Sequence, residues 1–440
     1  MNVTVMGLGT HGGGAGAVRD LCRRGARVTL TDRRTAEELA APLAALGCEP
    51  AVLKLGGHDP ADFLNADLIV ASPAVPFRHE LLEAARSAGV PVTTELALAA
   101  AALPAGVTTA AVTGSNGKST TCAFLHAMLR AKHARLGRGA AWLAGNGGGS
   151  LLDDIDRVRP GDAVVWEVSS FQLEYLRETA PFRGALRADA AVVTNFAPNH
   201  LDRHQSLAAY RSAKQGLLEN LRPADTAVLN AADADVRDWP TAARRVLFET
   251  RPCPLPGAHN AQNAAAAEAA ARALGCTAED VEEGLKTAVL PPHRLQGVAE
   301  RDGVRFVDDS AATTPESVIA ALEALPGPLF LIAGGADKGA DLAAAAAAIA
   351  QRAAGAYFIG TTGPRWRDLV AAANPKCPAL NCGTLPAAFA AAVAAARQAG
   401  GGTVLLSPGC SSLDQFASYE ARGATFAAMA SDDVDSSLLE

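Results

Sequence analysis

The sequence has few aromatic residues, no excess of positive charge and no long apolar run. Phe, Trp and Tyr make up 5% of the 440 residues, and the formal net charge is −7. A negative balance argues against nonspecific nucleic-acid binding, which needs a basic surface. No apolar run reaches about 18 residues without a proline or a charge, so we expect no membrane-spanning helix.

The chain also lacks any C-x-x-C motif, although it contains eight cysteines. Scattered cysteines of this kind are typical of reduced structural thiols and argue against a disulfide framework or a zinc site. The N-terminal MNVTVMGLGT has no basic residues before its apolar part. This predicts a strand rather than a signal peptide, so we expect a cytoplasmic protein.

Short apolar runs alternate with helical stretches in three successive parts of the chain, which predicts three α/β units with parallel sheets. Breaks near residues 103–106 and 290–292 place the domains at 1–104, 105–292 and 293–440. The expected strands are residues 3–6, 28–31, 68–71, 90–93, 108–113, 163–167, 190–194, 304–308, 329–333, 356–359 and 403–407. The expected helices include residues 15–24, 79–88, a helix from 118, 262–274 and 342–350.

The strongest local motif is T-G-S-N-G-K-S-T at residues 113–120, placed between a predicted strand and a predicted helix. Backbone N–H groups of such a loop, with the helix N-terminus, form an anion site. Lys118 would reach the outer phosphates of a nucleotide and Ser119 would coordinate Mg²⁺. The general P-loop pattern has a glycine where Val112 stands. The alternative is a tight turn with a surface lysine.

A second glycine pattern, Gly7-x-Gly9-x-x-Gly12, follows the first predicted strand, and Asp32 ends the second. This spacing is typical of dinucleotide sites, where the acidic residue binds a ribose hydroxyl. One interpretation is therefore an NAD-dependent oxidoreductase. The P-loop in the next domain argues against it, because hydride transfer needs no phosphoryl chemistry. The site could instead hold the diphosphate and sugar of another nucleotide.

An acid and a histidine stand at the ends of two predicted strands in the central part of the chain. Glu167 ends one strand, and His200 follows another. Ligands of open α/β sheets bind at the carboxyl ends of the strands. Near a P-loop, these two side chains could bind a second metal ion, whereas a lone histidine is usually structural.

Seven phrases of the sequence resemble the Mur ligases in their order along the chain. They are T-G-S-N-G-K-S-T, E-V-S-S-F-Q-L-E, N-x4-H-L-D-R-H, H-N-A-Q-N-A-A-A-A, P-H-R, D-D-S-x-A-T and L-S-P-G-C-S-S-L-D-Q-F-x-x-Y-E-x-R-G, within residues 107–426. S-S-F-Q-L and S-L-D-Q-F-x-x-Y-E-x-R-G are similar to the members that add D-glutamate. The resemblance implies a Rossmann-like first domain, a P-loop ATPase-like central domain with a parallel sheet, and a Rossmann-like third domain.

The resemblance implies an ATP-dependent, ADP-forming ligase of peptidoglycan precursor synthesis that works through an acyl phosphate. Its partners would be UDP-N-acetylmuramoyl-L-alanine and D-glutamate, its cofactors ATP and Mg²⁺, and its state a monomer. Lys118, Glu167, His200 and a carbamylated Lys214 would be catalytic, the last three and Ser119 binding metal.

The remaining implied contacts fall into four groups. The nucleotide would contact Gly114, Ser115, Asn116, Gly117, Lys118, Ser119, Thr120, Asn260, Asn263, Arg294 and Asp309. D-glutamate would contact Thr313, Lys338, Ser412 and Phe416, and the muramoyl group Asn146. The uridine end would contact Thr10, His11, Asp32, Arg33 and Arg34.

The sequence departs from the family at three places. Ala311 replaces the lysine of D-S-K-A-T, Asn199 replaces an acid before His200, and residues 147–149 are all glycine. Two further alternatives therefore stay open. One is a folylpolyglutamate-type ligase, which S-L-D-Q-F disfavours. The other is a non-catalytic nucleotide-binding relative, which the retained Lys118, Glu167, His200 and Lys214 disfavour.

Overall fold

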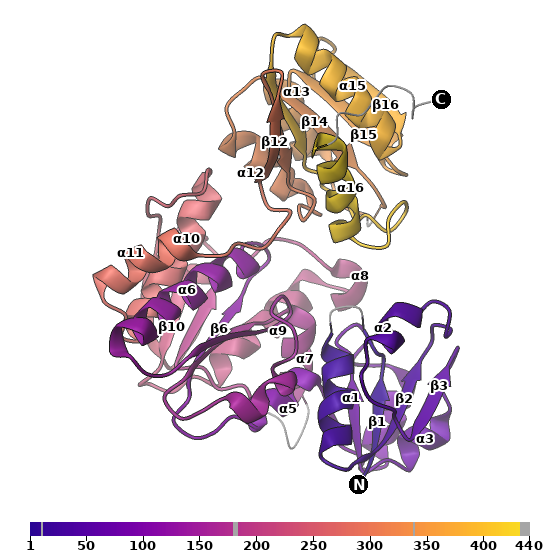
Figure 1. Cartoon of the computed structure of the whole chain (residues 1–440), viewed down its shortest axis with the longest axis vertical. Coiled ribbons are helices and arrows are strands. Elements are labelled where there is room, and N and C mark those ends of the chain that lie inside the picture. The colour runs from indigo at the N-terminus through magenta and orange to yellow at the C-terminus, as the bar shows by residue number, and fades with distance from the viewer. Residues whose placement is uncertain (10–11, 179–183, 338, 432–440) are drawn as a thin grey trace. The chain divides into compact units, whose positions relative to one another are not determined.

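The structure is a computed structural model that describes residues 1–9, 12–178, 184–337 and 339–431. The chain divides into two compact units, Met1–Pro254 with Gln262–Val289, and Leu255–Ala261 with Leu290–Glu440. Three sheets carry the architecture, two in the first unit and one in the second (Figure 1). The predicted α/β class with three sheets is confirmed. The exact domain boundaries stay a prediction.

The first sheet is five-stranded and parallel, with strand order β3-β2-β1-β4-β5. Its strands are β1 (Asn2–Met6), β2 (Arg27–Asp32), β3 (Val52–Leu55), β4 (Leu68–Ala71) and β5 (Val92–Thr93). Its helices are α1 (Gly13–Arg23), α2 (Ala40–Ala44), α3 (Pro60–Leu64), α4 (Glu80–Ser87) and α5 (Glu95–Ala101). The order reverses between β1 and β4, where a ligand crevice is expected at the carboxyl ends.

The second sheet is six-stranded and parallel, with order β11-β10-β9-β6-β8-β7. Its strands are β6 (Thr108–Thr113), β7 (Ala141–Gly145), β8 (Ala163–Glu167), β9 (Ala190–Val193), β10 (Thr226–Asn230) and β11 (Arg244–Phe248). Its helices are α6 (Lys118–Leu136), η1 (Leu151–Asp153), η2 (Ile155–Arg157), α7 (Ser170–Glu178), α8 (Leu201–His204), α9 (Leu207–Glu219), η3 (Val236–Asp238), α10 (Ala258–Ala273) and α11 (Ala278–Thr287).

One hydrophobic core joins the first two sheets. It contains Leu21 of α1 and Leu96 of α5 together with Leu151 of η1 and Trp166 of β8, all at most 5% exposed. Gly16 of α1 lies so close to Ser150 that an added Cβ would come within 2.2 Å of its Oγ. The first two sheets therefore share buried surface rather than forming separate cores.

The third sheet has order β12-β13-β17-β14-β15-β16 and is parallel except for β12, which pairs antiparallel with β13. Its strands are β12 (Gln296–Arg301), β13 (Val304–Asp308), β14 (Leu329–Gly334), β15 (Gly355–Ile359), β16 (Ala379–Gly383) and β17 (Gly402–Leu406). Its helices are α12 (Pro315–Ala324), α13 (Ala343–Arg352), α14 (Gly363–Ala373), α15 (Leu385–Gln398) and α16 (Tyr419–Ser431).

The two faces of the third sheet have separate cores, both built from its own unit. Leu331 packs in the cluster with α12, α13 and α14, and the adjacent Ile332 packs in the cluster with α15 and α16. Successive strand residues point to opposite faces, so this alternation is expected for a sheet covered on both sides.

The eleven predicted strands are all present, with shifts of one or two residues at their ends. The strands that the apolar pattern did not predict are β3, β7, β10, β11, β12 and β16. Five of these are outermost strands of their sheets, where partial exposure weakens the apolar pattern. The eight cysteines are free thiols. No helix in the described ranges is both long enough and apolar enough to cross a bilayer.

Candidate functional site

The loop between β6 and α6 requires glycine at two positions. Gly114 has φ 149° and Gly117, the N-cap of α6, has φ 81°. A Cβ at Gly114 would lie 1.8 Å from Thr194 Oγ1, and one at Gly117 would lie 2.2 Å from Asn263 Oδ1. The loop is therefore a tight strand-to-helix turn that ends at a helix N-terminus, as an anion site requires.

The segment after β9 holds this loop from the side. Asn195 accepts hydrogen bonds from the backbone N–H groups of Ser115 (3.0 Å, to its carbonyl) and Asn116 (2.9 Å, to its side-chain oxygen). Thr194 Oγ1 donates to the Asn116 carbonyl at 2.6 Å. Ser115 Oγ in turn donates to Ala197 O at 2.9 Å. These bonds fix the loop conformation without a ligand.

Two lysines converge on the carbonyl oxygen of Gly114. Lys118 Nζ donates to Gly114 O and to Ser115 O, each at 3.1 Å, and Lys214 Nζ donates to Gly114 O at 2.7 Å. Lys214 is 1% exposed. Burial, and secondly the charge of Lys118, lower the pKa of Lys214 well below its usual value. Burial thus favours the neutral amine at Lys214.

Glu167 ends β8 as a buried carboxylate beside the glycine-rich segment after β7. Asn146 Nδ2 donates to its Oε1 at 3.1 Å, and a Cβ at Gly147 would lie 2.4 Å from its Oε2. The buried Cys122 in α6 lies near both Glu167 and Lys118, since both charges act on its thiol pKa. Burial, then Glu167, raise that pKa, and Lys118 opposes the rise.

Aromatic rings connect the predicted histidine to the loop. The rings of His200 and Phe171 meet edge to face, with centroids 4.9 Å apart, and the Tyr210 ring lies 6.4 Å from that of His200. Tyr210 OH and Ser115 Oγ are 3.1 Å apart and share a hydrogen bond. Lys214 Nζ lies 4.7 Å from the Tyr210 ring centroid. The structure thus groups His200, Lys214 and the glycine loop around Tyr210.

The donor set near the loop fits a weakly held magnesium ion better than a preformed metal cage. Among the residues that the structure describes, no three His, Cys, Asp or Glu side chains are grouped to hold a metal. Mg²⁺ at nucleotide sites is bound by phosphate oxygens and waters with one or two protein oxygens. Ser119, at the start of α6, and the buried Glu167 carboxylate could supply such oxygens.

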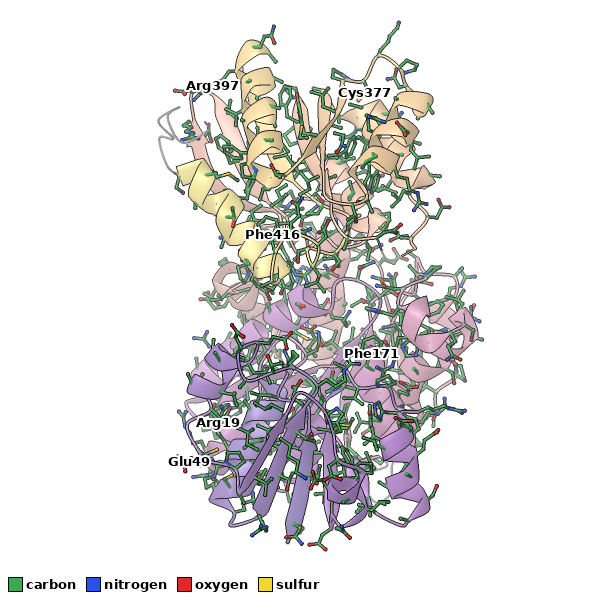
Figure 2. The ribbon with its side chains drawn as sticks, turned by 90° about the vertical axis from the view of Figure 1, so that its right-hand side faces the viewer. Arg19, Glu49, Phe171, Cys377, Arg397 and Phe416 are labelled. Atoms are coloured by element: carbon green, nitrogen blue, oxygen red, sulfur yellow. The ribbon has the colours of Figure 1, made fainter. Side chains whose placement is uncertain are left out.

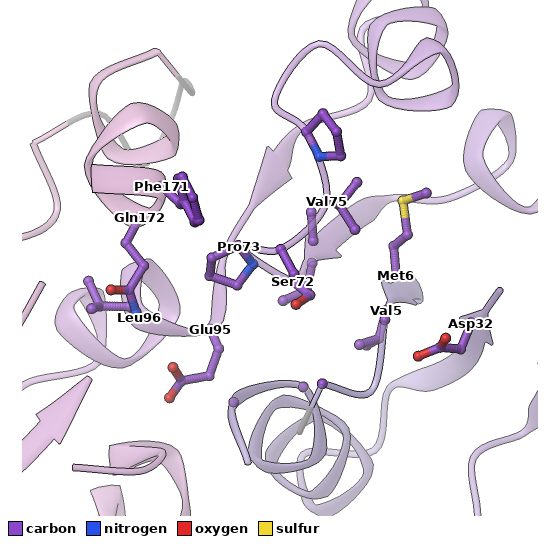
Figure 3. Close-up of a pocket in the computed structure, with 18 of the residues that line it drawn as sticks. Val5, Met6, Asp32, Ser72, Pro73, Val75, Glu95, Leu96, Phe171 and Gln172 are labelled. Carbon is purple, nitrogen blue, oxygen red and sulfur yellow. The ribbon is translucent and has the colours of Figure 1, made fainter. Parts of the chain in front are cut away.

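A cavity of about 740 Å³ lies in the first unit, at the carboxyl ends of the first sheet. Asp32 and Met6 stand on one side, Phe171 and Gln172 on the other, and Ser72 and Pro73 between them (Figure 3). Gly7, Gly9 and Asn146 also line it. Asp32, Arg33 and Arg34, which were predicted for the uridine end, therefore line the same cavity as Asn146, which was predicted for the muramoyl group.

Asp32 is already paired inside this cavity. Arg34 donates to it from Nη2 (2.9 Å), Nε (3.1 Å) and its backbone N (3.0 Å), and Leu8 N donates at 3.0 Å. Burial acts to raise the pKa of Asp32, but these hydrogen bonds outweigh it and lower the pKa. Arg33 lines the cavity as well. Thr10 and His11 lie outside the described residues.

No site role was assigned from the sequence to several polar residues of this cavity, although two of them, Ser169 and Gln172, belong to the phrase S-S-F-Q-L. They are His58, Ser72, His79, Glu95, Ser169 and Gln172. Glu95, at the start of α5, is 8% exposed and accepts a hydrogen bond from Ser150 Oγ at 2.5 Å. Its only sequence signal is a helix start after a strand, which specifies no function.

In the second unit, the loops after β13 and β17 lie side by side. Asp309 accepts hydrogen bonds from Ser407 Oγ (2.8 Å) and Leu295 N (3.2 Å), and Gly409 N donates to Ala312 O at 2.8 Å. Burial raises the pKa of Asp309 to about 7 against the effect of these bonds. Adjacent parallel strands thus bring together two predicted sites, those of the nucleotide and of D-glutamate.

The other described residues of the second unit that were predicted to contact the nucleotide or D-glutamate lie in loops or near helix starts. Thr313 lies between Ala312 and α12, and Ser412 O accepts from Phe416 N at 2.9 Å in the loop before α16 (Figure 2). Asn260 Nδ2 donates to Pro256 O at 2.8 Å, and Arg294 acts on the pKa of both His259 and Asp309. Ala311 N donates to His293 O at 3.0 Å. Lys338 lies outside the described residues.

Three family models match successive parts of the chain. They are the MurD-like N-terminal domain of Mur ligases at residues 1–94, the Mur ligase middle domain at 112–250 and the Mur ligase glutamate ligase domain at 293–410. Together they cover all three sheets except the first part of β6.

The chain is similar over nearly its full length to curated proteins named UDP-N-acetylmuramoylalanine--D-glutamate ligase. The one from Anaeromyxobacter dehalogenans is 38% identical, with 98% of this chain and 97% of the relative covered. The one from Roseiflexus sp. is 36% identical, with 96% of each covered. The solved UDP-N-acetylmuramate-alanine ligase MurC of Thermotoga maritima has a TM-score of 0.62 at 20% identity, covering 98% of this chain and 99% of that one, and shows the shared fold.

Proposed function

The chain belongs to the Mur ligase family as a UDP-N-acetylmuramoylalanine--D-glutamate ligase, and we propose that the glycine loop after β6 and the cavity beside Asp32 carry its reaction. It is an ATP-dependent, amide-bond-forming enzyme of peptidoglycan synthesis. The observation that carries the site assignment is the convergence of Lys118 and Lys214 on one loop carbonyl, inside a strand-to-helix turn that only glycine can form.

The glycine loop is the proposed site of the ATP phosphates. Residues 114–120 would present backbone N–H groups and the start of α6 to the phosphates, and Lys118 would turn from the loop carbonyls to the outer phosphate. Asn263 supports the loop at Gly117. Mg²⁺, when bound through Ser119 and Glu167, would neutralise charge on the phosphate oxygens. In the second unit, Asn260, Arg294 and Asp309 are the proposed nucleotide contacts.

The proposed chemistry has two steps. The substrate carboxylate attacks the terminal phosphorus of ATP, which gives an acyl phosphate and ADP. The amine of D-glutamate then attacks the acyl carbon, phosphate leaves, and the amine loses a proton as the amide forms. Catalysis here is mainly positioning and charge neutralisation. His200, placed by Phe171 and Tyr210, is proposed to contact the metal or the transferred phosphate.

Lys214 is proposed to act as a carbamate. Its neutral amine would attack CO₂, form an N–C bond and release a proton, which turns a buried amine into an anionic oxygen ligand for a metal. The support is the burial of Lys214 and the lowered pKa of its amine. A protonated lysine could not react in this way.

We propose contacts for the UDP-linked substrate in the first unit and for D-glutamate in the second. Asp32, Arg33 and Arg34, with Thr10 and His11, would contact the uridine end, and Asn146 the muramoyl end. D-glutamate would contact Thr313, Lys338, Ser412 and Phe416. The use of ATP and a UDP-linked precursor favours the cytoplasm as the place of action, and a monomer is the proposed state.

Phosphate release from ATP tests the function. With UDP-N-acetylmuramoyl-L-alanine present, we expect release with D-glutamate and at least 100-fold less with L-glutamate or diaminopimelate. Omitting the UDP-linked substrate should reduce release to background. Absence of release with every acceptor would instead indicate a non-catalytic relative, the alternative that Ala311 raises.

A further inference from the structure

The carboxyl group of Glu95 is buried in the wall of the substrate cavity. Thr94 caps α5 by accepting from Ala97 N, which fixes Glu95 as the first residue of this helix. Glu95 is 8% exposed and lines the cavity, where Figure 3 shows it beside Leu96. Its Oε1 accepts the Ser150 hydroxyl at 2.5 Å. Its Oε2 lies 3.8 Å from where a Cβ of Gly13 would be, at the first turn of α1.

The charges around Glu95 do not offset its own. Of the elements packed against α5, α1 presents Asp20, which Arg23 and Arg24 bind, and η1 presents Asp153, which Arg19 binds. The ionisable residues elsewhere in the cavity wall are Asp32, Arg33, Arg34, His58 and His79. Within the described ranges, no Lys, Arg or His forms an ion pair with Glu95.

Burial therefore dominates the ionisation of Glu95. It raises the pKa to about 7, the Ser150 hydrogen bond opposes this rise, and Asp153 and Asp20 add to it. Near neutral pH the group holds a proton for much of the time. Because Ser150 donates to Oε1, the proton belongs on Oε2, the oxygen beside Gly13.

An anionic ligand in the same cavity would favour that proton further. The N-terminus of α1, with Gly12 as its N-cap, favours an anion, and a diphosphate placed there would lie close to Glu95. Two anions that share a poorly hydrated site repel each other, which raises the pKa of the carboxyl group. A neutral carboxylic acid instead donates a short, strong hydrogen bond to a phosphate oxygen.

We propose that Glu95 binds the diphosphate-linked sugar substrate as a neutral carboxylic acid, donating from Oε2, so that substrate binding takes up a proton above neutral pH. This inference rests on the proposed function, because it takes the cavity as the site of the UDP-linked substrate. It adds a pH-dependent positioning residue that the glycine and Asp32 pattern does not contain.

Calorimetry of the full chain with UDP-N-acetylmuramoyl-L-alanine tests the proposal. Titrations at pH 8.5 in buffers of different ionisation enthalpy should give uptake of nearly one proton, and those at pH 6 nearly none. The Kd should weaken by up to tenfold per pH unit above pH 7, as proton linkage requires.

Glu95→Gln keeps a donor at this place and removes the titration. Its Kd at pH 6 should lie within about threefold of the wild-type value, it should not change with pH, and proton uptake should disappear. Glu83→Gln, at an exposed position of α4, is the matched control and should keep the wild-type pH profile. Thermal unfolding of each variant checks that it is folded.

Three results would overturn the proposal. Wild-type binding without proton uptake at pH 8.5 would show that Glu95 does not gain a proton. Loss of binding by a folded Glu95→Gln at every pH would show that an ionised carboxylate accepts a bond from the sugar. A wild type that binds no UDP-linked substrate would overturn the proposed function, and this inference with it.

Discussion

At the scale of single residues, the side chains of Lys118 and Lys214 meet at one backbone oxygen. Both donate to the carbonyl of Gly114, so two full positive charges would meet at one oxygen. The lowered pKa of the buried Lys214 relieves this conflict, because its amine loses the proton more readily. Lys118, the first residue of α6, is the group proposed to meet a phosphate.

Lys118→Ala should lower ATP turnover by 100-fold or more, since it removes a cation from a preformed anion loop. Phosphate release measures the loss, and the thermal unfolding temperature should change by only a few degrees. Lys286→Ala, an exposed lysine in the last turn of α11, is the control and should keep full activity. A Lys118→Ala enzyme with normal turnover would contradict the assignment of the loop.

Asp309 gives a pH dependence of stability that can be measured without substrate. Its usual pKa of 3.8 rises to about 7 in the buried site, so between these values the folded chain keeps a proton that the unfolded chain has released. The contribution of Asp309 to the free energy of unfolding is therefore largest below pH 4, and it is lost as the pH rises to 7. The loss is ~4 kcal/mol at most.

Asp309→Asn resembles the protonated form and should remove this loss. The thermal unfolding temperature of the wild type should fall more between pH 4 and pH 7.5 than that of the variant, which should be the more stable protein at pH 7.5. Asp302→Asn, at an exposed position before β13, should behave like the wild type. Parallel pH profiles of wild type and Asp309→Asn would contradict the shifted pKa.

At the scale of elements, α7 and α8 hold one wall of the cavity proposed for the UDP-linked substrate. Arg203 of α8 donates to the carbonyls of Ala74 (3.0 Å) and Val75 (2.7 Å), and Tyr175 of α7 donates to Val75 O at 3.0 Å. The segment between β4 and α4 lines the cavity at residues 72–76. Its position is therefore set by helices of the other sheet.

Arg203→Lys should loosen this wall, because an ammonium group cannot bond two carbonyls in the planar fork of a guanidinium. We expect the KM for the UDP-linked substrate to rise by about tenfold, as for the loss of one charged hydrogen bond, and the KM for ATP to change less than twofold. Arg222→Lys, whose partner Asp225 is three residues away, controls for the exchange itself. Equal effects on both KM values would show that Arg203 does not act selectively on this cavity.

The elements that sequence could predict are those whose pattern is local. Strand β6, the glycine loop and α6 follow from one continuous motif, and the inner strand β14 from its apolar run. The edge strands β11 and β12 are largely exposed and lack such a run. Strand β10 is fully buried and was still not predicted, although its TAVLN is as apolar as other strands that were.

Some site residues could likewise be predicted from a local motif, whereas others depend on tertiary contacts. Lys118 stands in a recognisable motif, whereas Lys214 reads as an ordinary helix residue until folding buries it against Gly114. The role of Glu95 depends on Ser150 and Asp153, more than fifty residues away. Partners at such separations are set by tertiary packing and leave no spacing in the sequence.

At the scale of the molecule, the three sheets do not have three independent cores. The core of the first sheet continues into the second, from Val3 to Ala243. The two cores of the third sheet are built from buried residues between Val304 and Ala430. The core shared by the first two sheets and the two cores of the third sheet are thus built from different described residues, while the boundaries at 104/105 and 292/293 stay predictions.

Fragments of the chain should differ in thermal stability according to which cores they contain. A fragment of residues 293–440 should fold alone and unfold in one cooperative thermal transition, as should a fragment of residues 1–289. A fragment of residues 1–104 exposes the faces of Leu21 and Leu96 that pack on the second sheet, and it should unfold at least 10 °C below the 1–289 fragment. Circular dichroism melts measure all three, and a 1–104 fragment as stable as 1–289 would contradict the shared core.

The contact between Gly16 and Ser150 also limits how such genes can recombine. A relative's segment for residues 1–104 would bring its own residue to the position of Gly16, and any side chain there would collide with Ser150. The recipient's serine is also the only hydroxyl that bonds Glu95 in the described chain. We therefore expect chimeras joined beyond residue 158 to be more stable than chimeras joined at residue 104.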